Sequence, residues 1–328
     1  GVGPLLYNSL LKNLPIDLPE KLKIALKEEY ISNSALSLFY GKALKEIVAH
    51  LQKNEITFAL HKGLGIAALL YPDPVLRPCG GDFDLFIKRE DYSRTKSRLR
   101  EIGYQLLQPE YEKYEINYAQ EVKFIKLMPG KDILIELHLE FNAHPWTKIS
   151  GFDLKGFWDK LVAVKYNDFY IPCLPVEPNL FFLILHCAVN HNFDRLILFC
   201  DIDLLIRKYQ SVIDWEHIAD YACQNNCRKA FYFTLNYCRQ MLATPIPDSF
   251  LKRLTPGRIL HLLLSSRRII FSKDKDNPKK GLKNYFCKKY MHLLLLDNPL
   301  LFYKSMALFL RWNYYAYRVK KKTGRPFF

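Results

Sequence analysis

Two carboxylates in the segment Gly81–Ile87 could hold a metal ion together. The residues run Asp82-Phe83-Asp84 and continue into an apolar stretch. Because side chains two apart in a strand point to the same face, Asp82 and Asp84 would project side by side while Phe83 points the other way. Adjacent carboxylates repel unless a cation lies between them, and Mg²⁺ prefers such oxygen ligands. The pair could equally be two solvated acids of an edge strand, so its interpretation depends on the surrounding sequence.

Two further segments carry residues suited to the same chemistry. Lys62-Gly63 lies at a predicted strand-to-helix turn, where a small residue allows phosphates to approach the backbone and the helix N-terminus. Downstream, alternation in the segment from Asp132 predicts that Glu136 and His138 share one face of a strand. An acid among Ile and Leu on a central strand needs a compensating partner. We therefore predict Glu136 as a third metal ligand. His138, on the same face, is a candidate nucleotide contact.

Three more side chains complete the candidate set. Arg77 offers a planar fork for phosphate oxygens, although it could instead pair with Asp73 or Asp82 and hold the loop. His191 and Arg195 are candidates for contact with a nucleotide or an acceptor. Packing or helix capping is the alternative for both.

A second Asp-x-Asp run, Asp201-Ile202-Asp203, does not predict a metal site. It falls inside the helical pattern 196–209, where residues two apart lie about 200° apart around the axis. These two acids therefore cannot share one ion. Asp201 could still support the site through a hydrogen bond.

The elements that must position these residues can be read from periodicity and from Pro and Gly. Apolar spacing predicts N-terminal helices over 19–29 and 31–54, and short helices over 64–70 and 91–102. Strands are predicted over 56–60 and 82–87, with hairpins at 121–128/132–141 and 162–171. From Asn179 to about Tyr317 the sequence is helical throughout.

This order of elements predicts an α/β protein. We expect a small mixed β-sheet core at 55–174, flanked by an N-terminal helical segment at 1–54 that packs on it. A helical C-terminal domain at 175–328 follows. The chain of 328 residues, with 49% hydrophobic and 25% charged residues, has the composition of a globular protein.

Cysteine and hydropathy patterns bear on the compartment. Eight cysteines are scattered through hydrophobic stretches, which favours reduced thiols in a cytoplasm over a secreted disulfide scaffold. No run of 18 apolar residues occurs, so we expect no transmembrane segment.

Almost all of the net charge of +15 belongs to the C-terminal quarter. Residues 252–328 hold 19 Lys and Arg against three acids, whereas the rest of the chain holds 29 bases and 30 acids. Near its end, Tyr314, Tyr315 and Tyr317 lead into a basic run at 318–322. This asymmetry favours an anionic partner, either RNA or a membrane surface to which the protein would be peripheral. A solvated edge of a helical bundle is the alternative.

The order of these motifs resembles the DNA polymerase beta nucleotidyltransferase superfamily: a glycine turn, Asp-x-Asp on a strand, and an acid on a later strand. More specifically, the chain is similar to a bacterial branch, the uncharacterised nucleotidyltransferase family. The residues that carry this similarity are Pro4–Tyr7, Lys62-Gly63, Tyr71–Pro74, Arg77, Gly81–Leu85, Gly103-Tyr104, Glu136–His138, and His191, Arg195, Asp201 and Asp214-Trp215. The similarity covers most of residues 3–250 and not the basic region beyond 255.

The resemblance implies transfer of a nucleoside monophosphate from an NTP, with ATP the expected one, to an acceptor that the sequence does not identify. Asp82, Asp84 and Glu136 would be the catalytic and metal-binding residues, holding two Mg²⁺ ions, with Mn²⁺ as an alternative. Lys62, Gly63, Arg77, His138, His191 and Arg195 would bind the nucleotide.

Three positions depart from the pattern of the superfamily. Leu64 stands where a Ser or Gly usually follows the glycine, His61 replaces an apolar residue, and Glu136 replaces the more common Asp. Because Leu64 supplies no hydroxyl group for the triphosphate, a second hypothesis stays open. In it, the protein is a non-catalytic module that senses nucleotide and docks on RNA or a membrane.

Overall fold

The computed structural model describes residues 1–12, 18–139, 154–257, 295 and 297–323. The chain divides into two compact units. The first comprises Gly1–Glu140, Leu154–Pro175 and Tyr315–Phe328, and the second comprises Phe141–Asp153 and Val176–Tyr314. The α/β class predicted from the sequence is confirmed, with a mixed sheet and helices before and after it.

The first unit is built on a seven-stranded sheet in the order β3-β4-β5-β2-β1-β7-β6. Its strands are β1 (Phe58–Leu60), β2 (Asp82–Ile87), β3 (Gln105–Leu106), β4 (Glu121–Lys126), β5 (Ile133–His138), β6 (Val162–Tyr166) and β7 (Phe169–Cys173). The pairs β2/β5 and β1/β7 are parallel and the other pairs antiparallel. Strand β5 therefore lies between β4 and β2, in the interior position predicted for the strand of Glu136.

Both predicted hairpins are present. The first joins β4 to β5 through the turn at Pro129-Gly130, and the second joins β6 to β7. In the second, Tyr166 pairs with Phe169, so the loop is Asn167-Asp168, and Asn167 has a φ of 51°. Asn tolerates this left-handed conformation, which two-residue hairpin loops require. The predicted end of the first hairpin at Phe141 lies outside the described residues.

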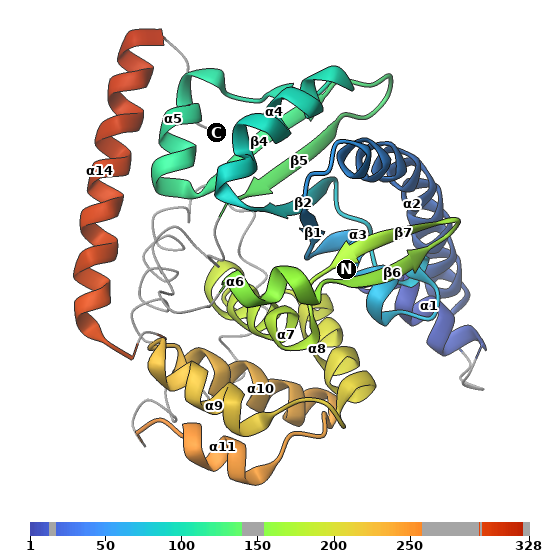
Figure 1. The fold of residues 1–328 in the computed structure, drawn as a ribbon. Helices are drawn as coiled ribbons and strands as arrows, with labels where there is room; N and C mark the ends of the chain where they lie inside the picture. Colours follow the sequence, from blue (N-terminus) through green and yellow to red (C-terminus); the bar gives the residue numbers. More distant parts are fainter. Residues whose placement is uncertain (13–17, 140–153, 258–294, 296, 324–328) are drawn as a thin grey trace. The chain divides into compact units, whose positions relative to one another are not determined.

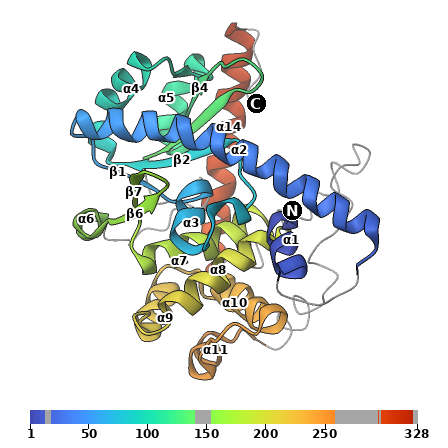
Figure 2. The same cartoon turned by 90° about the vertical axis from the view of Figure 1, so that its right-hand side faces the viewer.

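Helix α2 (Glu20–Lys53) covers one face of the sheet (Figure 1, Figure 2). Leu44, Ile47, Val48 and Leu51 on its inner side join one core with the odd-numbered residues of β2 and β5, Phe83, Leu85, Ile135 and Leu137. The opposite face of these strands carries Asp84, Glu136 and His138. The strand alternation that hides the apolar residues therefore places the acids together on the other face.

The two helices predicted over 19–29 and 31–54 are one helix in the structure, so the prediction of a break is wrong. Residues 20–53 form one helix because no Pro or Gly interrupts it before Gly41. Asn33, near the predicted break, is buried and holds the loop between α3 (Gly63–Leu70) and β2. Its amide group donates to the Val75 and Arg77 carbonyl oxygens at 2.6 and 3.1 Å and accepts from the Cys79 N–H at 2.7 Å. The long helix thus fixes the segment that leads into Asp82.

The remaining helices of the first unit have ten residues or fewer, and the first of them is α1 (Gly3–Lys12). Helix α4 (Tyr92–Glu101) confirms the helix predicted over 91–102. It is followed by α5 (Glu112–Tyr114), the turn η4 (Glu115–Ala119) and, after β5, α6 (Leu154–Phe157).

The second unit is helical, as the sequence predicts. Its described helices are α7 (Val176–Leu185), η6 (His186–Asn190), α8 (Leu196–Tyr209), α9 (Trp215–Gln224), α10 (Arg228–Leu242), α11 (Asp248–Leu254) and α14 (Pro299–Thr323), whose residues from Tyr315 belong to the first unit. The helical prediction over 258–294, with most of the basic region, lies outside the described residues. Within the described residues, every helix is too short or too polar to span a bilayer.

Candidate active site

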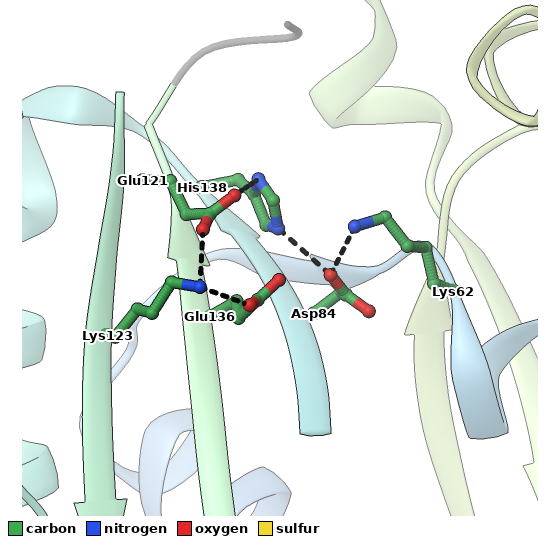
Figure 3. Close-up of polar contacts among 6 residues, drawn as sticks. All are labelled: Lys62, Asp84, Glu121, Lys123, Glu136 and His138. Atoms are coloured by element: carbon green, nitrogen blue, oxygen red, sulfur yellow. Dashed lines mark hydrogen bonds and ion pairs between the residues drawn. The ribbon is translucent and has the colours of Figure 1, made fainter. Parts of the chain in front are cut away.

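Asp84 is the centre of a polar cluster on the face of the sheet opposite α2 (Figure 3). Asp84 on β2 pairs with Glu136 on the neighbouring strand β5, and Phe86 pairs with His138 in the same register. One oxygen of Asp84, Oδ1, lies 2.5 Å from Nζ of Lys62 and 3.0 Å from Nε2 of His138. The carboxylate is almost fully buried, with 3% of its side chain exposed. The predicted placement of Asp84, Glu136 and His138 on one face is therefore confirmed.

Lys62 reaches Asp84 from the turn between β1 and α3. It is the residue before the helix, and Gly63, the first helical residue, has a φ of 49°. This left-handed conformation costs an L-residue about 1 kcal/mol or more, whereas glycine adopts it freely. The glycine turn found in the sequence thus places Lys62 where its ammonium group reaches Asp84.

Strand β4 adds two residues that the sequence analysis did not select. Lys123 pairs with Glu136 across the hairpin, and its Nζ lies 2.9 Å from Glu136 Oε1 and 3.4 Å from Glu121 Oε1. Glu121 Oε2 lies 3.6 Å from Nδ1 of His138. A symmetric hairpin about Pro129-Gly130 puts these residues opposite Glu136 and His138, so the turn could have revealed them.

The charges of the cluster show in its pKa values. Burial alone would raise the pKa of Asp84, but Lys62, His138 and His61 hold it well below its usual range. Burial raises the pKa of Glu136, and repulsion from Glu121 and Asp84 raises it further. Burial and the charge of Asp84 likewise raise the pKa of Asp82. Like-charge repulsion between carboxylates is therefore only partly offset by the two lysines.

Asp82 stands at the start of β2 and is more exposed than Asp84. A methyl group on Gly80 would lie 2.7 Å from Asp82 Oδ1, so the absence of a side chain at Gly80 makes room for this carboxylate. With Asp84, Glu121 and Glu136 it gives four carboxylates, against the ammonium groups of Lys62 and Lys123. Their sum, −2, equals the charge that one divalent cation neutralises.

The donor set fits Mg²⁺, because carboxylate oxygens that repel one another are the ligands this ion prefers. Among the described residues there are two groups of three side chains whose potential ligand atoms all lie within 4.8 Å of one another. Neither group includes Asp82. One is formed by Glu121, Glu136 and His138, and the other by His61, Asp84 and His138.

The other predicted contacts are placed as follows. Arg77 is buried in the loop that Asn33 holds. His191 follows η6 and Arg195 precedes α8, both in the second unit, and their contact with a nucleotide remains a prediction. Asp203 lies on α8, as the periodicity predicts, and pairs with Arg207 at 2.9 Å.

Comparison with known sequences decides the family. The sequence profile described as uncharacterised nucleotidyltransferase matches residues 1–243, which is most of the chain. The chain belongs to this family. No curated protein and no solved structure matches it significantly. The match to the nucleotidyltransferase profile spans the entire sheet and ends at α10, before the basic region, as the motifs in the sequence predicted.

Proposed function

We propose that the protein is a Mg²⁺-dependent nucleotidyltransferase that moves a nucleoside monophosphate from an NTP to an acceptor and releases pyrophosphate. ATP is the expected NTP. The family assignment supports nucleotidyl transfer. The observation that carries the proposal is the buried Asp84 beside Glu136 on neighbouring parallel strands, with Lys62 from the glycine turn at 2.5 Å.

Asp82, Asp84 and Glu136 would hold Mg²⁺, or Mn²⁺ in its place. When bound, the metal stabilises charge on the phosphates and lowers the pKa of the attacking oxygen. The charge of −2 on the cluster balances one divalent ion, so a second ion would enter with the negative charge of the triphosphate. Lys123 positions Glu136 by its 2.9 Å contact.

Lys62 and Gly63 would bind phosphate oxygens, since an ammonium group and backbone N–H groups meet at the start of α3. Arg77, His138, His191 and Arg195 are the further proposed nucleotide contacts. We propose that residues 55–174 carry the reaction, supported by the helical segment 1–54. The helical region 175–328 would contribute to nucleotide or acceptor binding.

The test uses purified protein with Mg²⁺ and an NTP labelled on the α-phosphate. Transfer predicts that the α-label becomes attached to an acceptor, either the protein itself or a co-purifying molecule, while pyrophosphate appears in equal amount. Release of label as free nucleoside monophosphate would indicate hydrolysis instead. Nucleotide binding without pyrophosphate would contradict the proposal.

That last outcome is the second candidate function, a nucleotide sensor. It is favoured by Leu64, which is buried and supplies no hydroxyl where the superfamily usually has Ser or Gly beside the phosphates. Retention of Asp82 and Asp84 argues against it, because a sensor does not need two metal-binding carboxylates. The labelled-NTP experiment separates the two functions.

For the C-terminal helix we propose an anionic membrane surface as partner, with the protein working in the cytoplasm and peripheral to that membrane. Tyr303, Leu310, Tyr314 and Tyr317 on α14 are each more than 60% exposed, and their spacing of three, four and seven residues puts them on one face. The helix has no acid, and its basic residues at 318 and 320–322 are exposed.

Tyr315 does not join this face, although the sequence analysis grouped it with its neighbours. Its ring stacks on Tyr114 at 5.0 Å between centroids. Aromatic rings beside cations suit the interface of an anionic bilayer.

Seven described cysteines are free thiols, which agrees with a cytoplasmic location.

A further inference from the structure

Two buried histidines, His61 and His138, form a nitrogen-rich cluster with Asp84, beside the other carboxylates proposed for Mg²⁺. His61 directly follows β1, Asp84 lies on β2, and His138 ends β5, and these three strands are neighbours in the sheet. Their ligand atoms lie within 4.8 Å of one another, and each residue is at most 5% exposed. The two imidazole rings are 4.6 Å apart and nearly perpendicular. The sheet therefore brings two nitrogen donors and one oxygen donor to a single point.

This donor set differs from the one that Mg²⁺ prefers. Two neutral imidazoles and one carboxylate suit divalent first-row transition metals, Zn²⁺ among them, and leave further coordination positions open. Asp82, which the proposed Mg²⁺ site requires, does not belong to this group. His61 belongs to it and to no part of the Mg²⁺ site. The two ions would thus share Asp84 and differ in their other ligands.

A second carboxylate lies behind His138. Nε2 of His138 faces Asp84 at 3.0 Å, whereas Nδ1 faces Glu121 Oε2 at 3.6 Å, and the three residues lie in a row (Figure 3). A histidine that binds metal through one ring nitrogen commonly directs the other toward a carboxylate, which fixes the ring and strengthens the ligand. Lys123 in turn contacts Glu121 at 3.4 Å. The orientation of His138 needed for a metal is therefore already built.

Lys62 would compete with any ion at this point. Its Nζ lies 2.5 Å from the same oxygen of Asp84 that His138 contacts. An ammonium group and a metal cation cannot both occupy that position, because their like charges would be buried side by side. Binding of the ion therefore requires Lys62 to move away from Asp84.

We propose that His61, Asp84 and His138 bind a divalent transition metal, with Zn²⁺ preferred, and that the bound ion inhibits nucleotidyl transfer by withdrawing Asp84 from Lys62 and from Mg²⁺. Binding is independent of the proposed function, whereas the inhibition rests on it. The site would make the enzyme sensitive to free Zn²⁺ in the presence of excess Mg²⁺.

Binding is tested on the full chain without nucleotide, using Co²⁺ as a spectroscopic probe and Zn²⁺ as its competitor. The wild type should show visible Co²⁺ absorption that Zn²⁺ abolishes and Mg²⁺ does not. His61→Leu should weaken Co²⁺ binding at least about tenfold. His50→Leu is the matched control, since His50 contacts a single carboxylate, Glu101, at 3.2 Å, and it should bind like the wild type.

Two further variants separate this site from the Mg²⁺ site. Lys62→Met should bind Co²⁺ more tightly, because the competitor is gone. Asp82→Asn should lose nucleotidyl transfer yet bind Co²⁺ within about threefold of the wild type. A wild type that binds Co²⁺ but transfers no nucleotide would contradict the proposed function and leave the metal site intact. A wild type that transfers nucleotide but does not bind Co²⁺ would contradict the metal site alone.

X-ray absorption at the zinc edge of the wild type tests the same assignment without any variant that must fold. Two imidazole ligands are expected. A shell without imidazole, or equal Co²⁺ affinity in His61→Leu and His50→Leu, would overturn the proposal.

Discussion

Removing the ammonium group of Lys62 should destabilise the protein, because it leaves a buried carboxylate without its nearest counter-charge. The side chains of Lys62 and Asp84 are only 14% and 3% exposed, and their charged atoms are 2.5 Å apart. Breaking such a pair from one side typically costs about 3–5 kcal/mol. His138 still contacts Asp84 at 3.0 Å in the variant, so for Lys62→Met we expect a loss of about 3 kcal/mol in the free energy of unfolding.

The measurement is urea unfolding followed by circular dichroism at neutral pH without divalent ions. Lys62→Met should lower the midpoint and leave the slope unchanged, which marks a change in stability alone. Lys45→Met is the matched control, since Lys45 also pairs with an aspartate, Asp168, but their side chains are 50% and 68% exposed. Exposed pairs contribute little because water screens them, so this control should unfold like the wild type.

Mg²⁺ provides a second readout on the same variant. An ion that binds the folded protein stabilises it, and Asp84 freed from Lys62 should accept Mg²⁺ more readily. Saturating Mg²⁺ should therefore raise the midpoint of Lys62→Met more than that of the wild type. Equal midpoints for Lys62→Met and Lys45→Met would refute the reasoning, since Asp84 would then not depend on a buried counter-charge.

Three more predictions concern other parts of the chain. Burial, and then the charge of Glu121, raises the pKa of Glu115 to about 8. Its contribution to stability is therefore complete below its ordinary pKa of 4.5 and is lost as pH rises toward 8. In urea unfolding at several pH values, the wild type should lose at most about 1.4 kcal/mol of unfolding free energy per pH unit in this range, and Glu115→Gln should not. Equal pH dependence of the unfolding free energy in the two proteins would contradict this prediction. Gly80→Ala should displace Asp82 and lower transfer without lowering the unfolding midpoint, whereas Gly156→Ala, with nothing within 4 Å of the added carbon, should change neither; equal rates for the two would refute the close approach. Replacing Lys320, Lys321 and Lys322 together by Gln should weaken binding to anionic vesicles by about 1 kcal/mol for each lysine at the surface, as should Tyr314→Ser by loss of apolar burial. Binding to single-stranded RNA with a steep salt dependence, but not to vesicles, would exclude the membrane as the partner.

Strand alternation was enough to predict which face of the sheet carries the candidate residues. Side chains alternate between the two faces of a strand. Because the apolar residues at 83, 85, 135 and 137 must face the core, Asp84, Glu136 and His138 lie on the other face. The sequence also excluded Asp203 as a metal ligand, because helical geometry separates it from Asp201. These conclusions need only the local periodicity of each element.

What the sequence did not predict depends on contacts between elements. Lys123 and Glu121 join the site through the antiparallel register of β4 on β5, which the position of Pro129-Gly130 implies but the residue types do not. The break predicted near Tyr30 is absent because no Pro or Gly interrupts the helix before Gly41. The bonds of Asn33 to a loop more than 40 residues away were likewise not predictable from local periodicity.

The central claim is that Asp84 holds the metal for nucleotidyl transfer, and the most direct test compares the two Asp-x-Asp runs by one assay. Pyrophosphate release from NTP and Mg²⁺ is measured for Asp84→Asn and for Asp203→Asn, the same chemical change at an acid held on a helix by Arg207. We predict that Asp84→Asn lowers the rate about 10²-fold or more, while the protein stays folded. Asp203→Asn should keep the rate within about twofold, since it lies outside the metal-binding residues. An Asp84→Asn variant with unchanged pyrophosphate release would contradict the account.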